Sequence, residues 1–276
     1  MDYQMSYSRY KAYQTCPAAA WAKYHTDWKE GPKECFAIGQ YVDLALLTPE
    51  IPLVPESFQP DNVPFLFDQK GQLRNTAGLR KVQACIAAAQ SNEIIRNALL
   101  NTERQAVLYP TIGGAVWKCA LDVWDTVQER VWDLKTSGNP YKKTWSPKHS
   151  ERVSYITAFG YGYQLAVYRE AVRQAVDRTP RAGIIAVGLT DPPDIRLHPW
   201  SNPYQLDAYL AEIEHNMTES WYAPFECVTW PPIMDMATRT TVEGLPRCEE
   251  WEEKPCQYCL ETRTQFVFPH CDPDPR

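Results

Sequence analysis

Residues 115–124, AVWKCALDVW, and residues 130–136, RVWDLKT, are separated by a short polar break and decide the fold. Both segments are rich in Val, Trp and Leu and alternate in polarity, which predicts two β-strands joined in a hairpin. Since successive side chains on a strand point to opposite faces, Asp133 and Lys135 share one face of the second strand. Pairing of the two strands would bring Asp122 of the first strand close to them. Two carboxylates and one ammonium group would then meet on a largely apolar sheet.

Such a cluster is costly to remove from water unless another group compensates its charge. A divalent metal ion bound by Asp122 and Asp133, with Lys135 beside it, would provide that compensation. Alternating Asp and Lys residues are also common on exposed faces of hairpins, so the spacing alone leaves an ordinary solvated hairpin as the alternative.

The composition limits the class of protein. The chain has 276 residues, which suits one large domain or a domain with a small appendage. Its 28 Lys and Arg residues against 34 Asp and Glu give a formal charge of −6, which disfavours a broad, non-specific nucleic-acid-binding surface. A nuclease remains compatible with this charge, because bound metal ions neutralise the carboxylates of a site. The nine cysteines are expected to be thiols or metal ligands in a reducing compartment.

Asp122, ten intervening residues and then Asp133-Leu134-Lys135 resemble the signature of the PD-(D/E)XK nuclease superfamily. The phrase VWDLKTSG is similar to the (I/V)xDxKT strand of its RecE-like, lambda-exonuclease-like and RecB-like members. The resemblance implies an α/β fold with a restriction-endonuclease-like core, in which helices flank a mixed central sheet. It also implies a metal-dependent exonuclease that hydrolyses phosphodiester bonds at DNA ends, in phage-type recombination or DNA processing. Asp122 and Asp133 would hold Mg²⁺ or Mn²⁺, and Lys135 would act beside them in catalysis.

Two further acidic residues are candidates for the metal site. Residues 36–48, FAIGQYVDLALLT, predict an apolar helix that is similar to the GxxxH helix of this superfamily. Gly39 matches the pattern, and Asp43 stands where the family has His. Carboxylate oxygens also bind Mg²⁺ and Mn²⁺, so the exchange preserves the chemistry. The resemblance also implies that Glu103 joins the metal site or its surroundings, whereas a Glu just after a helix is usually solvated.

A long amphipathic helix is predicted over residues 151–178. It places Gln164 and Tyr168 on one face, four positions apart. A QxxxY pair after the Asp-x-Lys strand is a feature of the RecB-like and RecE-like nucleases and implies that both side chains approach the catalytic site. A buried core position is the alternative for Tyr168. The loop before the helix carries four basic residues that are candidates for DNA phosphate contacts, with a solvated loop as the alternative: Lys142, Lys143, Lys148 and Arg152.

The remaining pattern predicts the other elements of the chain. They are a helix over residues 6–25 interrupted at Pro17, an extended surface segment over 49–78, two helices over 79–100 broken near Ser91-Asn92, a strand over 104–110, a buried strand over 182–189, an irregular Pro-rich piece over 191–199 and a helix over 204–222. We expect a single nuclease domain over residues 1–276, with an N-terminal helical region (1–35) and a Cys-rich tail (240–276) as appendages.

The cysteines of the tail include a C-x-x-C pair, which can chelate a metal ion from a tight turn. The resemblance to RecB-like nucleases implies a 4Fe-4S cluster in which Cys16 joins tail cysteines. A Zn²⁺ ion held by the tail alone and a group of free thiols are the alternatives. The candidate ligands are Cys16, Cys248, Cys256, Cys259 and Cys271.

The expected partner is DNA with double-stranded ends. No P-loop, helicase or zincin motif is present, so the sequence gives no evidence of ATP use. The resemblance further implies a homo-oligomeric ring and a single-strand annealing partner protein. No long apolar run and no signal-peptide pattern are found, which predicts a cytoplasmic protein, in the host cytoplasm if phage-encoded, without a membrane span. A catalytically inactive nuclease-fold module that binds DNA or protein is the alternative function, because of Asp43 and the acidic net charge.

Overall fold

The computed structural model describes residues 4–15, 17–25, 31–146 and 149–218. These residues fall into two compact units, and residues 32–215 form the unit that contains the central sheet. The described part of the other unit comprises α1 (Tyr7–Thr15), α2 (Pro17–His25) and the last residues of α9 (Pro203–Thr218). The start of α2 at Pro17 agrees with the predicted interruption. The Cys-rich tail and Cys16 lie outside the described residues.

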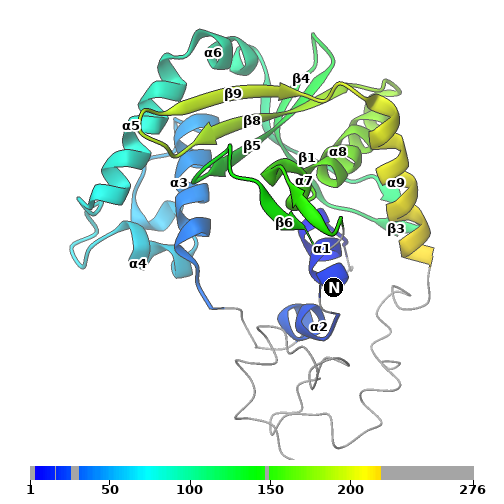
Figure 1. Cartoon of the computed structure of the whole chain (residues 1–276), viewed down its shortest axis with the longest axis horizontal. Coiled ribbons are helices and arrows are strands. Elements are labelled where there is room, and N and C mark those ends of the chain that lie inside the picture. The colour runs from blue at the N-terminus through cyan, green and yellow to red at the C-terminus, as the bar shows by residue number, and fades with distance from the viewer. Residues whose placement is uncertain (1–3, 16, 26–30, 147–148, 219–276) are drawn as a thin grey trace, which may run out of the picture. The chain divides into compact units, whose positions relative to one another are not determined.

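The unit of residues 32–215 is built on a five-stranded mixed sheet with the order β1-β4-β5-β8-β9 (Figure 1). The strands are β1 (Glu103–Leu108), β4 (Cys119–Asp125), β5 (Arg130–Ser137), β8 (Arg181–Gly188) and β9 (Asp194–Pro199). β5 and β8 are parallel, and the other neighbouring strands are antiparallel. The sheet confirms the predicted α/β class, and β4 and β5 confirm the predicted hairpin.

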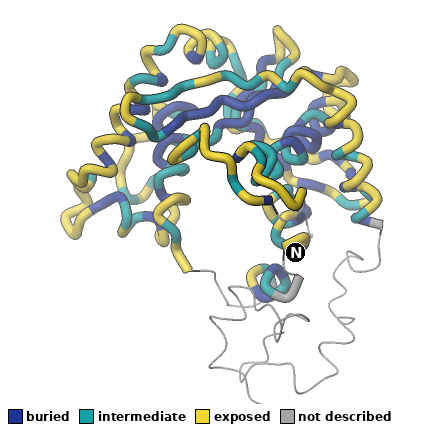
Figure 2. Tube along the Cα trace, in the orientation of Figure 1, coloured by how far each residue is buried: buried dark blue, intermediate teal, exposed yellow. Residues whose placement is uncertain are grey.

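One face of the sheet is covered by α3 (Glu34–Leu47), α5 (Ala77–Ser91) and α6 (Glu93–Leu99). These helices share a buried apolar cluster with side chains of the central strands, among them Trp132 and Leu134 of β5. Figure 2 shows that the middle of the sheet is buried while the outer surfaces of the helices are exposed. Because Trp132 and Leu134 point into this cluster, the alternating residues of β5 must point to the other face.

The other face is covered by α8 (Tyr161–Val176), which contacts β4, β5 and β8. The prediction of one helix from residue 151 onward was wrong. The structure has β7 (Glu151–Val153), the one-turn helix α7 (Tyr155–Ala158) and then α8. β7 pairs with β6 (Thr144–Ser146) in a two-stranded sheet. Gly160 separates α7 from α8 with a φ of +68°, a left-handed conformation that glycine adopts without strain and that ends a right-handed helix.

The predicted break between two helices near Ser91-Asn92 is confirmed, and one side chain explains it. The backbone N–H of Asn92 donates to Ala88 at the end of α5. Its side-chain Oδ1 accepts from the N–H groups of Ile94 and Ile95 at the start of α6. Asn is among the best N-cap residues because its short side chain satisfies these free donors. Asn92 therefore ends one helix and starts the next.

The first motif segment is divided more finely than predicted. Ala115–Val116 form β3, which pairs with β2 (Thr111–Ile112), and the strand of the main sheet starts only at Cys119. Trp117 lies between them with its side chain fully buried, and its Nε1 donates to the Ile112 carbonyl at 3.0 Å. The division between β3 and β4 therefore falls at Trp117 and Lys118.

Two other segments differ from the sequence prediction. The Pro-rich piece at 191–199 contains β9, an edge strand that pairs with β8. An edge position tolerates proline because one side of the strand makes no ladder hydrogen bonds, and Pro199 is its last residue. The segment 49–78 is not simply extended, since it holds the short helices η1 (Pro55–Ser57), η2 (Pro60–Asn62) and α4 (Val63–Leu66). Among the described residues, no helix has the length and apolar character needed to cross a membrane.

Candidate active site

The hairpin of β4 and β5 opens at the position of the two motif aspartates. The backbone ladder joins Asp125 to Arg130, Trp124 to Val131 and Val123 to Trp132. The next pair in this register would be Asp122 with Asp133, but the ladder stops before it. Instead, the backbone N–H of Leu134 donates to Oδ2 of Asp122 at 2.8 Å. A side-chain carboxylate thus replaces a main-chain acceptor, and Asp122 is held at the point where the strands separate.

Asp133 is fully buried and paired with Lys135 two positions further along β5. The ammonium Nζ of Lys135 lies 2.9 Å from Oδ1 and 2.8 Å from Oδ2 of Asp133. Only Oδ1 is aligned as a hydrogen-bond acceptor, so Oδ2 is a buried oxygen without a hydrogen bond. Buried carboxylate oxygens are normally fully bonded. Here Oδ2 is held by its 2.8 Å ion pair with the Lys135 ammonium.

Asp133 and Lys135 change each other's pKa, and the Asp122 carboxylate acts on both. Burial raises the pKa of Asp133, the Lys135 ammonium opposes this, and the nearby Asp122 carboxylate adds to it. Burial alone would lower the pKa of Lys135, but Asp133 and Asp122 outweigh burial and raise it above its ordinary value. Lys135 is therefore a permanent cation at neutral pH. Its single charge faces more than one carboxyl group.

The third acidic group of the cluster is Asp43, which α3 supplies. Burial raises the pKa of Asp43 to about 8, and repulsion by Asp122 and Asp133 adds to the rise, while Lys135 opposes it. Helix α3 comes close to β5 at Gly39, where a Cβ atom would lie 4.0 Å from Oγ1 of Thr136. The structure thus places Asp43, predicted to replace the family His, within electrostatic reach of both motif aspartates.

Gln164 and Tyr168 face the same cluster from α8. Nε2 of Gln164 donates to the Tyr168 hydroxyl at 2.7 Å. Burial raises the pKa of Tyr168 well above 10, and the Asp133 and Asp122 carboxylates raise it further. The Tyr168 hydroxyl therefore keeps its proton at neutral pH and can act as a hydrogen-bond donor. The two side chains of the QxxxY pair are thus joined to each other, and Tyr168 is within electrostatic reach of both motif aspartates; their approach to a catalytic site stays a prediction.

Two residues of the cluster were not predicted. Gln105 of β1 lies opposite Asp122, and its Nε2 donates to Oδ1 of Asp122 at 3.3 Å. Its φ of +54° is uncommon for a residue other than glycine. The Tyr161 ring lies under the Lys135 ammonium, with Nζ 5.1 Å from the ring centroid. A polar residue within the strand ERQAVL was the only sequence signal for Gln105, and Tyr161 had none.

Other predicted site residues lie elsewhere. Glu103 is exposed at the start of β1, opposite Trp124, and no contact or electrostatic effect joins it to the carboxyl cluster in the described part of the chain. It lies two positions along β1 from Gln105, and its inclusion in the metal site stays a prediction from sequence. The candidate DNA-contact residues Lys142, Lys143 and Arg152 are exposed.

Several predicted residues fall outside the described residues: Lys148, Cys16, Cys248, Cys256, Cys259 and Cys271. The cysteines that the structure does describe, Cys35, Cys85 and Cys119, are free thiols, and only Cys35 is exposed. The proposed iron–sulfur or zinc site stays a prediction from sequence.

The donors of the cluster suit a hard divalent cation. Asp43, Asp122 and Asp133 offer carboxylate oxygens, which Mg²⁺ and Mn²⁺ prefer. Mutual repulsion and the unbonded Oδ2 of Asp133 are conditions that such a cation would relieve. In the described residues, however, no three His, Cys, Asp or Glu side chains are arranged as a ready-made metal site. Here the Lys135 ammonium stands next to both oxygens of Asp133.

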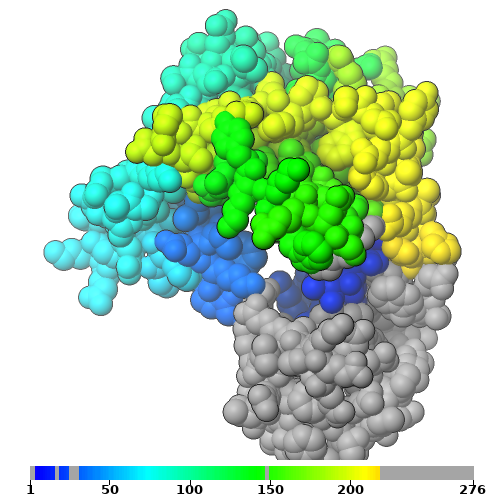
Figure 3. Space-filling model, in the orientation of Figure 1, coloured from blue at the N-terminus to red at the C-terminus, as the bar shows by residue number. Residues whose placement is uncertain are grey.

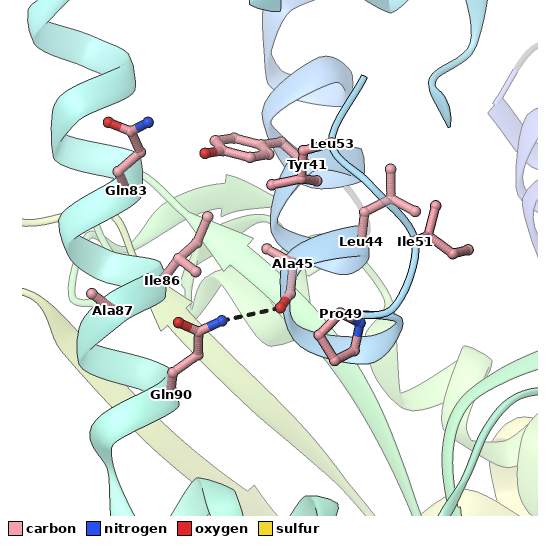
Figure 4. Close-up of a pocket in the computed structure, with 10 residues that line it drawn as sticks. All are labelled: Tyr41, Leu44, Ala45, Pro49, Ile51, Leu53, Gln83, Ile86, Ala87 and Gln90. Atoms are coloured by element: carbon pink, nitrogen blue, oxygen red, sulfur yellow. Dashed lines mark hydrogen bonds between the residues drawn. The ribbon is translucent and has the colours of Figure 1, made fainter. Parts of the chain in front are cut away.

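A separate cavity of about 360 Å³ lies between α3, α5 and the segment that follows α3 (Figure 4). Most of its lining is apolar, including Leu44, Ile51 and Ile86. Nε2 of Gln90 spans it to the Ala45 carbonyl at 3.2 Å. None of the predicted site residues lines this cavity.

Comparison with known proteins agrees with this geometry. The chain belongs to the family described as a PDDEXK-like domain of unknown function (DUF3799), which matches residues 6–224. The superfamily implied by the Asp122 and Asp133-Leu134-Lys135 motif is thereby confirmed.

Solved structures add a more specific likeness. The chain is similar to the crystal structure of a protein from Eubacterium rectale described as a "putative exonuclease", with 25% identity, a TM-score of 0.67 and coverage of 78% of each chain. It also matches the crystal structure of SSO0001 at 13% identity over 80% of this chain and 89% of that one, but the TM-score of 0.31 carries no argument. No curated protein matches the chain.

Proposed function

We propose that this protein is a metal-dependent deoxyribonuclease that hydrolyses phosphodiester bonds at DNA ends. The observation that carries the proposal is the cluster of Asp43, Asp122 and Asp133 around Lys135 at the opening of the β4–β5 hairpin. The family supports the nuclease class. The similarity to a protein described as a "putative exonuclease" supports action at ends.

Asp43, Asp122 and Asp133 would hold Mg²⁺ or Mn²⁺. Such an ion, when bound, activates water and stabilises the charge that develops on a phosphate undergoing hydrolysis. The protein's own contribution comes from Lys135, whose raised pKa keeps it cationic beside the place where the phosphate must lie. A fixed cation in a partly buried site stabilises developing negative charge far more than one in water. Tyr168, held by Gln164, would supply a neutral hydrogen-bond donor to the same region.

Lys142, Lys143 and Arg152 are proposed to contact the DNA backbone. They follow the Asp133-x-Lys135 strand directly in the chain and are exposed. Phosphate contacts of this kind set the register of a strand in the site and make binding sensitive to salt. A role in recombination or DNA processing, a ring-like oligomer and an annealing partner are proposals that rest on the resemblance alone.

The experiment is cleavage of end-labelled linear duplex DNA by the full chain, with Mg²⁺ and with Mn²⁺. A covalently closed circle of the same sequence serves as the substrate without ends. We expect the linear DNA to be degraded from its ends and the circle to persist. Asp133→Asn should abolish cleavage, whereas Asp61→Asn, an exposed aspartate of η2, should cleave like wild type. Wild-type protein that leaves linear DNA intact with both metals would refute the proposal and favour the inactive binding module.

A further inference from the structure

We propose that the β6–β7 hairpin is a stacking site for the bases of an unpaired nucleic-acid strand, with Trp145 as its anchor. The proposal rests on the proposed function in that nucleic acid is the ligand of both sites. The stacking site would contact bases, whereas the basic residues of the preceding loop are proposed to contact phosphates only.

The first argument is the exposure of aromatic side chains around this hairpin. Trp145 of β6 is 57% exposed, and Tyr141 and Phe159 are 62% and 45% exposed. These are three of the six large aromatic side chains that are exposed among the described residues, and they fall within one stretch of 19 residues. Tryptophan has the largest apolar surface of any side chain and is normally mostly buried. An exposed one on a short two-stranded ribbon therefore requires an explanation beyond folding.

The second argument is the charge that accompanies these rings. Trp145 lies directly opposite Arg152 in the β6–β7 ladder, so both side chains are on one face of the ribbon. Residues 136–168 contain one acidic residue, Glu151, in a chain whose net charge is −6. Their basic residues within the described ranges, Lys142, Lys143 and Arg152, are all exposed. A surface that combines exposed aromatic rings with local positive charge matches single-stranded nucleic acid, which offers bases and phosphates together. A duplex hides its bases from such a surface.

The third argument is the connection between the hairpin and the carboxyl cluster. β6 contacts α7, and Phe159 is the C-cap residue that follows α7. The Phe159 ring packs against Tyr161 at 5.9 Å between centroids, and Tyr161 in turn lies under the Lys135 ammonium. The hairpin is at the surface in Figure 3, where this region of the chain is green. These contacts connect the element that carries Trp145 to the surroundings of Lys135, where we propose that a phosphate of the stacked strand lies.

Tyr141 has a different part in this surface. The Arg196 guanidinium lies 4.6 Å from the Tyr141 ring centroid, and its Nη2 donates to the Tyr141 hydroxyl. Arg196 is itself held by Asp194. One face of the Tyr141 ring is therefore already occupied, whereas Trp145 has no ring or cation partner among the described residues. Trp145 is the side chain to test.

The test compares two 20-nucleotide probes, fluorescently labelled dT and a strand of equal length with abasic sites, in EDTA so that no cleavage occurs. Both probes carry phosphates, but only dT carries bases. Alanine substitution at a stacking ring lowers affinity about 5- to 100-fold per base. We therefore expect Trp145→Ala to weaken dT binding by about this factor and to leave abasic binding unchanged. Trp145→Phe should keep most of the dT affinity. Tyr204→Ala, at an 80% exposed aromatic of α9, should bind like wild type.

Equal dT binding by wild type and Trp145→Ala would overturn the inference, and so would an equal loss of dT and abasic binding. If Trp145→Ala failed to fold by circular dichroism, Trp145→Leu would replace it, because leucine keeps apolar bulk without an aromatic face. The outcome is separable from the proposed function. A protein that cleaves linear DNA but shows no base-dependent loss would refute only the stacking site. One that shows the loss but never cleaves would refute only the nuclease.

Discussion

Replacing Asp43 with Asn should make the stability of the metal-free protein much less sensitive to a rise in pH between about 4 and 8. The pKa of Asp43 rises from 3.8 to about 8 in the folded chain, chiefly through burial and then through Asp122. Between these two values the folded state binds more protons than the unfolded state, so the free energy of unfolding falls as pH rises. Each pH unit is worth about 1.4 kcal/mol, which sets an upper limit of about 6 kcal/mol for full ionisation of Asp43.

The measurable difference is smaller than this limit. Part of the repulsion belongs to the Asp122–Asp133 pair, which the variant retains. We expect the stability gap between Asp43→Asn and wild type to widen by about 3 kcal/mol from pH 5 to pH 9. Urea unfolding followed by tryptophan fluorescence, in EDTA at several pH values, gives the two curves.

Excess Mg²⁺ provides a second readout of the same cluster. If the carboxylates bind the cation, it should flatten the wild-type pH dependence, because a bound cation stabilises the ionised carboxylates. Parallel wild-type and variant curves in EDTA would refute the reasoning, since they would show that Asp43 ionises in the folded state as freely as in the unfolded chain.

Three further predictions concern the cluster and the tail. Lys135→Ala should lower the cleavage rate about 100-fold or more, since the loss of one electrostatic stabiliser commonly has an effect of this size. Its Mn²⁺ affinity, measured by calorimetry, should stay near wild type. Cleavage at the wild-type rate would show that Lys135 has no catalytic role. Gln105→Gly should relieve the φ of +54° and raise the free energy of unfolding by up to about 1 kcal/mol, as measured by denaturation. Cleavage should fall, because Asp122 loses its amide partner. An unchanged initial rate of cleavage would show that Gln105 has only a structural role. If the tail holds an iron–sulfur cluster, the protein should be brown, contain iron and lose its colour in Cys16→Ser. If it holds zinc, the protein should be colourless and should lose the metal in Cys256→Ser but keep it in Cys16→Ser. Metal analysis after anaerobic purification distinguishes the two, and protein with neither metal would mean free thiols.

The sequence predicted most of the sheet and the pairing that forms the site. Alternating polarity in residues 115–136 predicted the hairpin, and the spacing of Asp122 and Asp133-x-Lys135 identified the superfamily. Local chemistry also sufficed for the break at Asn92, whose side chain caps the next helix. These features depend on neighbours in the chain and on a strong periodic signal.

Features that depend on distant contacts were missed. The helical pattern of residues 151–178 gave no sign that Gly160 adopts a left-handed conformation, and β9 exists only because β8 offers it an edge. Gln105 could not be placed beside Asp122 without the register of β1 on β4. Glu103, exposed opposite Trp124 of β4, stays a prediction from sequence.

The hydrogen bond from the Leu134 N–H to Asp122 has a consequence for reading related sequences. Asp122 has two separable roles. Its Oδ2 accepts the Leu134 N–H in place of a main-chain carbonyl, and its charge affects the pKa of the other charged groups of the cluster. A descendant that had lost catalysis would still be under pressure to keep an acceptor at this position, and Asn would serve the strand as well as Asp. An aspartate here is therefore weak evidence of an active enzyme. The buried pair of Asp133 and Lys135 is the better indicator of an active enzyme, because burying an ion pair has a desolvation cost that the stability of the fold does not require.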